Sequence, residues 1–252
     1  MIPVAASFAL TEYRALLRSP LSMVFFFGLP AAISAILGSA VTGLNTGASD
    51  GRATLGFAVM FAYISVNYVG RALYREYYAR TWQRTAIAAP PRGAYLAGKC
   101  FAVFTISVGQ LCAFSVVAIF LLDLPLHGAG GIAQFLLLIV LHAASGVAVG
   151  AALFTLTTSV ETYLSVTYLI LITFAALGGA IVASSALPAW SRTVGVITPH
   201  HWAMRGFDNL TSEASSLAVT VESAIVLTAM CAILAAVSLA RFHFQDIKLA
   251  DL

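Results

Sequence analysis

Long apolar segments alternate with short polar ones along almost the whole chain. Six of them are long enough to cross a hydrocarbon core of roughly 30 Å as helices, since each helical residue adds about 1.5 Å. These predicted spans cover residues 21–44, 54–74, 100–122, 131–157, 162–184 and 218–240. Pro30 predicts a kink inside the first span. The pattern predicts an all-α integral membrane protein, with residues 1–252 forming a single transmembrane domain.

Two segments outside the spans have patterns of their own. Residues 5–18 place apolar and polar side chains on opposite sides of a helix, which predicts a helix in the membrane interface; a frayed cytosolic tail is the alternative. The apolar side carries Ala6, Leu10, Tyr13 and Leu17. Residues 185–217 are too apolar for a solvated loop and are divided by Pro188 and Pro199. They predict a broken re-entrant segment of two short helices, with an amphipathic loop on the outer surface as the alternative.

Composition agrees with this pattern and narrows the function. Hydrophobic residues make up 60% of the chain and charged residues 9%, and the mean hydropathy is +0.94. Six spans and their loops leave no room for a soluble catalytic domain. The net charge of +3 is modest, so nucleic-acid binding is not indicated.

Six of the thirteen lysines and arginines lie between Arg71 and Lys99. If this basic run is cytosolic, ten basic residues fall inside and three outside, the bias that orients most membrane proteins. Those outside are Arg52, Arg192 and Arg205. Both termini are then predicted to face the cytosol, in agreement with an even number of spans.

The segment from Gly93 to Cys100 nearly matches the phosphate-binding loop G-x-x-x-x-G-K-[ST]. The match fails because Cys100 offers no hydroxyl for magnesium and because Pro90-Pro91-Arg92, rather than a buried strand, precedes it. We instead expect Lys99 to be a snorkelling anchor at the cytosolic end of the third span.

Polar residues inside and between the spans suggest two further kinds of site, and neither is well supported. His142 and Ser145 lie one turn apart on one helix, with no sign of an oxyanion hole, so a serine hydrolase is not favoured. The G-x-x-x-G spacing of Gly146 and Gly150 predicts close helix packing instead. His200-His201 lack further metal ligands at a recognisable spacing.

The buried polar residues also bear on the energy source. We expect the uncharged polar groups in the spans to face neighbouring helices or a cavity; they are Asn67, Gln110, Gln134 and His142. No run of intramembrane carboxylates is present in the sequence, so the energy for pumping must come from outside the bilayer.

The basic run resembles the segment that follows the second span in permease subunits of type-2 ABC exporters. That family carries roughly R-E-x-x-x-G-T-x-E, then a proline, then G-K. Here the matching residues are Arg75-Glu76, Thr81-Trp82-Gln83, Pro90 and Gly98-Lys99. Arg80 stands in place of the Gly, and Gln83 in place of the second Glu. The resemblance extends over nearly the whole chain, from Leu17-Arg18-Ser19-Pro20 to Thr198-Pro199.

This resemblance implies a permease with no enzymatic activity of its own, which forms a dimer with a second, identical or homologous permease. Cytosolic ABC ATPase subunits would bind ATP and Mg and dock beneath it, while this chain would hold no cofactor or metal. Residues 75–99 would form the coupling loop, with a helix over 76–86 supported by the spacing of Glu76 and Arg80. The implied ATPase-coupling residues are Arg75, Glu76, Arg80, Thr81, Trp82, Gln83, Arg84 and Glu161. The simpler alternative is a solvated charge cluster that only sets orientation.

The resemblance further implies outward export of an amphipathic drug-like or lipid-like substrate across a bacterial inner membrane. The residues suggested for its path are Phe25, Phe26, Phe57, Phe61, Tyr63 and Asn67. An aromatic stripe of this kind is also typical of core or lipid-facing surface. Export of an envelope lipid or glycan is the alternative within the family. An intramembrane enzyme and an ion-coupled secondary transporter are the alternatives outside it.

Overall fold

The computed structural model describes residues 2–44, 50–126 and 128–244. Within these ranges, the side chains of residues 2–3, 22–23, 25, 37–44 and 128–129 fall outside the description. All regular elements in the described ranges are helical. In chain order they are α1 (Ile2–Leu17), α2 (Pro20–Met23), the π-helical turn η1 (Val24–Gly28), α3 (Leu29–Leu44), α4 (Asp50–Ala62), α5 (Ile64–Tyr78), α6 (Trp82–Ala88), α7 (Arg92–Phe120), α8 (Gly128–Leu156), α9 (Val160–Leu177), the 3-10 turn η2 (Ser184–Ala186), α10 (Ala189–Gly195), α11 (Pro199–Leu210) and α12 (Leu217–Arg241).

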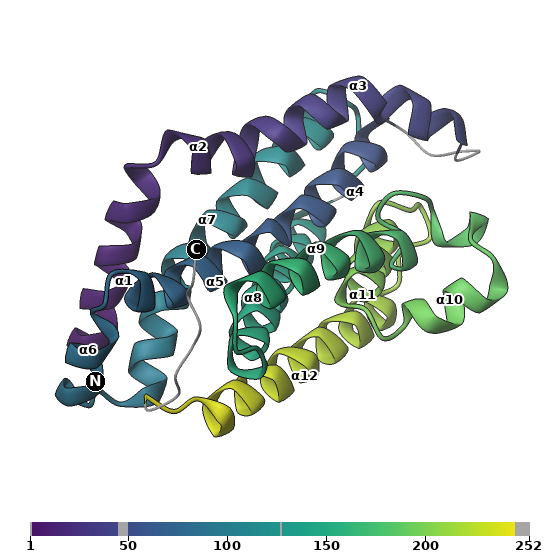
Figure 1. Cartoon of the computed structure of the whole chain (residues 1–252). Coiled ribbons are helices and arrows are strands. Elements are labelled where there is room, and N and C mark those ends of the chain that lie inside the picture. Colours follow the sequence, from purple (N-terminus) through teal and green to yellow (C-terminus); the bar gives the residue numbers. More distant parts are fainter. Residues whose placement is uncertain (1, 45–49, 127, 245–252) are drawn as a thin grey trace.

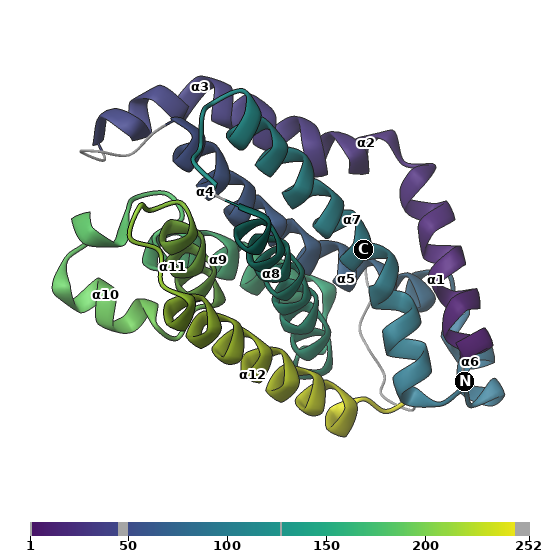
Figure 2. The ribbon, with the colours of Figure 1, turned by 180° about the vertical axis from the view of Figure 1, so that it is seen from behind.

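The helices form an elongated bundle with two distinct ends (Figure 1). α1 and α6 lie at one end, and α10 and the far end of α3 lie at the other. The view from behind shows α8 between α7 and α12, near the middle of the bundle (Figure 2).

Five stretches of the described residues are long and apolar enough to cross a membrane: 50–78, 92–120, 130–156, 160–177 and 217–241. They confirm the predicted spans from the second to the sixth. The second is α4 followed by α5, joined at Tyr63, whose amide donates to the Met60 carbonyl at 3.2 Å. That bond tightens the chain locally to 3-10 geometry, which separates the two helices.

Two predicted boundaries are wrong. α7 begins at Arg92 and not at residue 100, because the helix starts directly after Pro91, a residue that favours a helix start. Residues 92–99 are therefore helical and not part of a loop. α9 ends at Leu177 and not at residue 184, because Gly178 and Gly179 follow and Gly179 has a φ of +79°.

The first predicted span, 21–44, corresponds to α2, η1 and α3 in succession. A shorter apolar helix, Phe26–Ile36, lies within it. The predicted kink falls beside the π-helical turn, which ends just before Pro30. Proline lacks the amide that an α-helical hydrogen bond needs. Because residues 37–44 have no described side chains, a full first span and a count of six remain predictions.

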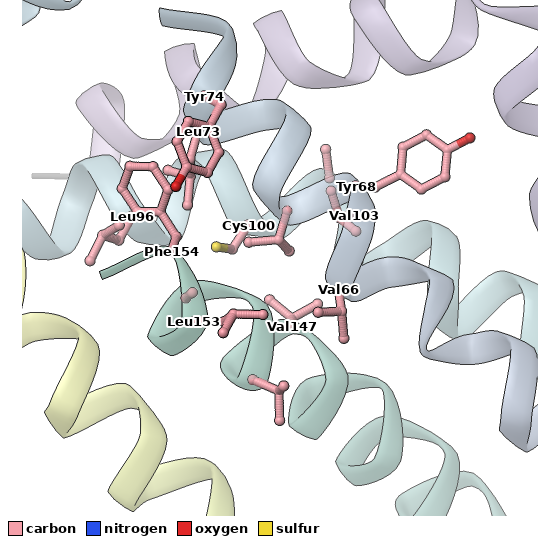
Figure 3. Packing of buried hydrophobic residues seen from close by; sticks show 14 of the residues in the cluster. Val66, Tyr68, Leu73, Tyr74, Leu96, Cys100, Val103, Val147, Leu153 and Phe154 are labelled. Carbon is pink, nitrogen blue, oxygen red and sulfur yellow. The ribbon is translucent and has the colours of Figure 1, made fainter. Parts of the chain in front are cut away.

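The core is built around α8, whose small residues allow close packing. A Cβ at Gly146 would lie 2.7 Å from Ser65 Oγ, and one at Gly150 would lie 2.9 Å from Val69 Cβ. Both neighbours belong to α5, so the predicted G-x-x-x-G packing face is confirmed. Around this contact, Val66, Cys100 and Leu153 bring α5, α7 and α8 together (Figure 3).

At the end of the bundle that carries α10, two short helices follow the two prolines as predicted. α10 begins after Pro188, and α11 begins at Pro199, where Thr198 caps it by accepting a hydrogen bond from the His201 amide at 3.3 Å. The Trp202 indole donates to the Val196 carbonyl at 2.8 Å and ties the two helices together. Whether this segment enters the membrane stays a prediction.

Candidate coupling site and membrane-facing cleft

The predicted coupling helix over residues 76–86 is wrong, because the chain turns sharply inside it. α5 ends at Tyr78, and Arg80 has a φ of +53°. The Thr81 amide donates to the Glu76 carbonyl at 2.8 Å, and the Arg80 amide donates to the Tyr77 carbonyl at 3.1 Å. These two bonds define a Schellman motif, which usually has glycine at the left-handed position. Arg80 stands where the family pattern has glycine, and it adopts the left-handed conformation that this turn requires.

A buried ionic cluster lies directly behind this turn and joins three helices. Lys99 Nζ on α7 donates to Glu12 Oε1 on α1 at 2.8 Å and also to Glu76 Oε1 on α5. Arg75 donates to the same Glu12 oxygen at 2.6 Å, and Thr81 Oγ1 donates to Glu76 Oε2 at 2.6 Å. The side chains of Lys99 and Glu12 are 1% and 2% exposed. The cluster thus contains two acids and two bases of balanced charge, with Lys99 and Glu12 out of water and Arg75 38% exposed at its edge.

The prediction that Lys99 snorkels to the surface is therefore wrong. α1 covers it, because Gly98 lets the two helices approach until a Cβ there would lie 2.5 Å from the Ala5 carbonyl oxygen. At this distance Lys99 meets Glu12 instead of water. The near match to a phosphate-binding loop also has a packing explanation, since residues 93–100 form the first turns of α7.

α6 projects from this end of the bundle, and none of its residues is buried. Trp82 anchors its start by stacking on Tyr77 at 5.6 Å between ring centroids, with 16° between the planes. Gln83 and Arg84 are exposed, and Ile87 is 86% exposed. A single exposed isoleucine is ordinary on a protein surface, so Ile87 marks a contact only together with the position of α6 at the end of the bundle.

The second predicted coupling position, Glu161, is exposed in the first turn of α9. The turn before it is held to α5 by Tyr74, whose hydroxyl lies 3.1 Å from Thr157 Oγ1 and donates to the Ser159 carbonyl at 3.2 Å. Ser159 in turn caps α9 by accepting from the Thr162 amide at 3.2 Å. Tyr74 therefore links the two segments that the resemblance assigns to ATPase contact.

The residues suggested for the substrate path separate into two groups. Phe26, Phe57 and Tyr63 are buried in the core, and Tyr63 shares a hydrogen bond with Ser145 at 2.8 Å. Phe61 of α4 is also buried, and together with Asn67 it lines a cleft of about 520 Å³ between α3, α5 and α9. The side chain of the remaining residue, Phe25, lies outside the described residues. A transport role for any of them stays a prediction.

The cleft contains residues that the sequence prediction missed. Arg71, Tyr74 and Tyr78 line it together with Asn67. These four positions follow the spacing i, i+4, i+7 and i+11 along α5, which places them on one helix face. This helical spacing is visible in the sequence and could have identified Arg71, Tyr74 and Tyr78.

The other candidate sites have structural roles. Ser145 Oγ donates to the His142 backbone carbonyl at 2.7 Å, whereas His142 Nε2 lies 3.0 Å from the Val59 carbonyl. The two side chains therefore do not form a nucleophile and base pair. His200 packs on Tyr63 at 4.3 Å between ring centroids. No group of three or more metal-ligating side chains occurs among the described residues.

Comparison with known protein families agrees with these features. The family model of the ABC-2 type transporter matches residues 8–210, from α1 to the end of α11. A search of curated proteins gave no match. The matched region includes the Schellman turn, α6 and the buried ionic cluster. The chain therefore belongs to the ABC-2 type transporter family and is a permease subunit of a type-2 ABC transporter.

Proposed function

We propose that this permease belongs to an ATP-driven exporter that moves an amphipathic drug-like or lipid-like substrate outward across a bacterial inner membrane. A separate ABC ATPase binds ATP and Mg and supplies the energy. Both termini and α6 face the cytosol in this proposal. Membership of the ABC-2 family supports association with an ATPase. Export of an envelope lipid or glycan by the same kind of complex is the second candidate.

The observation that carries the proposal is the exposed helix α6 on its rigid base. Its apolar residue Ile87 is left uncovered by the described residues, and Trp82 and Thr81 fix the helix to α5. The buried cluster behind it joins α5 to α1 and α7, so a displacement of α6 is passed to three helices. We therefore assign ATPase contact to α6, with Gln83, Arg84 and Ile87 on its exposed side. Glu161 supplies the smaller contact.

We place the second permease against the face formed by α3 and α9. Large apolar side chains are exposed on α9, including Tyr168, Leu169 and Ile172. Residues of α3 and α9 also line the cleft between α3, α5 and α9. A second permease there would enclose the cleft as a path between two subunits. This arrangement is supported by the uncovered apolar area on α9.

The assignment of α6 can be tested with two matched isoleucines at opposite ends of the bundle. Ile87 is 86% exposed on α6, and Ile197 is 73% exposed between α10 and α11. We expect Ile87→Ser to weaken co-purification with the ATPase at least tenfold, while Ile197→Ser leaves it unchanged. Equal ATPase binding by the wild type and Ile87→Ser would contradict the assignment. Transport by the chain alone, driven by an ion gradient in liposomes without any ATPase, would contradict the whole proposal.

A further inference from the structure

The cleft between α3, α5 and α9 carries one kind of charge. Of the residues that line it, Arg71 alone is charged at neutral pH. The rest of the wall is aromatic and aliphatic, with Leu29, Phe61 and Leu171 from three different segments. An ionisable residue inside a membrane span is expensive to keep, and it usually faces a cavity with a function.

Arg71 differs from the other basic residues near it. Arg75 and Lys99 are bound to Glu12 or Glu76 in the buried ionic cluster. Arg71 makes no ion pair within the described part of the chain. The charges of the cluster's two acids and two bases cancel, so the charge of Arg71 remains as a net positive charge at the cleft.

The guanidinium of Arg71 is held in position without being neutralised. Its Cζ lies 5.4 Å from the centroid of the Tyr68 ring, and Tyr68 packs on Phe26 at 4.5 Å between ring centroids. Contact with an aromatic face orients an arginine and leaves its N–H groups free to donate. Arg71 also lines a smaller adjoining pocket of about 260 Å³ with Glu12 and Arg75. Glu12 Oε1 accepts from Arg75 and Lys99, and no ion pair joins Glu12 to Arg71 among the described residues.

A second donor lines the same cleft. Asn67 Nδ2 donates to the Tyr168 hydroxyl at 3.3 Å, so the proton of that hydroxyl points elsewhere. The hydroxyls of Tyr74 and Tyr163 are used by the protein, because they donate to backbone carbonyls of Ser159 and Val66. The cleft therefore presents a cation and a hydroxyl donor above an apolar wall.

We propose that the cleft selects an anionic amphiphile from the cytosolic leaflet. Its phosphate or carboxylate headgroup binds Arg71, and its apolar body lies along Phe61 and the α3 and α9 walls. The identification of the bound molecule as a substrate rests on the proposed export function. A cationic drug is disfavoured, since its charge would meet Arg71 with no carboxylate lining the same cleft.

Binding can be measured on the isolated full chain in nanodiscs of zwitterionic lipid. The probes are an alkyl phosphate and an alkyl trimethylammonium ion with the same tail. We expect the phosphate to bind about tenfold more tightly or better, as a charge-assisted hydrogen bond provides. Arg71→Gln should abolish that preference and Arg71→Lys should keep most of it. Arg241→Gln removes an exposed cation at the end of α12 and should have no effect.

Equal affinity for the two probes, or a preference that survives Arg71→Gln, would overturn the charge selection while leaving the permease assignment intact. A second arm uses the complex with its ATPase in liposomes. Stimulation of ATP hydrolysis by the alkyl phosphate supports a substrate. If the alkyl phosphate binds but does not stimulate ATP hydrolysis, in a complex whose basal hydrolysis is intact, the site holds a resident membrane lipid and the substrate inference is overturned. Failure of any ATPase to associate counts against the proposed function, and the nanodisc arm still decides the charge preference.

Discussion

Replacement of Lys99 by methionine should be strongly destabilising, although the residue lies near the start of a predicted span. Lys99 and Glu12 are 1% and 2% exposed, and Lys99 donates to both acids of the cluster. Methionine removes the shared cation and leaves Glu76 without an ion pair within the described residues. Removal of one partner from a buried ion pair costs about 3–5 kcal/mol, because the remaining charge stays out of water. For a chain of this size, that loss lowers the unfolding temperature by roughly 6–20 °C.

The measurement is thermal unfolding of the purified chain in detergent. Arg14→Met is the matched control, since it removes an exposed cation from α1 and should shift the transition little. Restoring neutrality in the double variant Lys99→Met, Glu76→Gln, which leaves Glu12 paired with Arg75, should recover part of the loss. A Lys99→Met transition within a degree or two of the wild type would refute the reasoning, and it would favour the snorkelling role that we rejected.

Three further substitutions test separate features by the same unfolding measurement. Arg80→Gly should stabilise the protein by about 1 kcal/mol, since glycine adopts the left-handed Schellman position without the strain of a Cβ; an unchanged transition would argue against that turn. Gly150→Val should destabilise by about 1–3 kcal/mol, because a Cβ there already lies 2.9 Å from Val69, whereas Gly109→Val has open space around it and serves as the control. Tyr74→Phe should cost about 0.5–1.5 kcal/mol by removing the hydroxyl that holds the turn before α9, and an equal effect from Tyr78→Phe would contradict this specific role.

Features that depend on local sequence were predicted well. The predicted span 218–240 became α12 at Leu217–Arg241, because a long apolar run flanked by polar residues determines a spanning helix by itself. The starts of α10 and α11 were predicted from Pro188 and Pro199, because proline is favoured at the start of a helix. The end of α9 was missed because apolar residues continue past Gly178-Gly179, and hydropathy does not register the backbone conformation that those glycines adopt.

Features that depend on distant contacts were not predictable from the pattern. The position of Lys99 in the sequence is typical of a snorkelling residue, and its burial depends on α1 crossing at Gly98. The face of α5 that carries Asn67, Arg71 and Tyr74 is visible in the sequence as a helical period. That it borders a cleft depends on where α3 and α9 lie. The aromatic stripe gave the general location of the cleft but could not separate its core members from its lining.

The buried ionic cluster also constrains how the protein is made. Glu12 is separated from Lys99 by 87 positions and from Arg75 by 63. During synthesis Arg75 leaves the ribosome before Lys99, so Glu12 can meet one cation of the cluster before the other. The site that holds α1 is complete only when the start of α7 follows, because Gly98 and Lys99 both lie there. Full docking of α1 therefore comes after synthesis of Lys99.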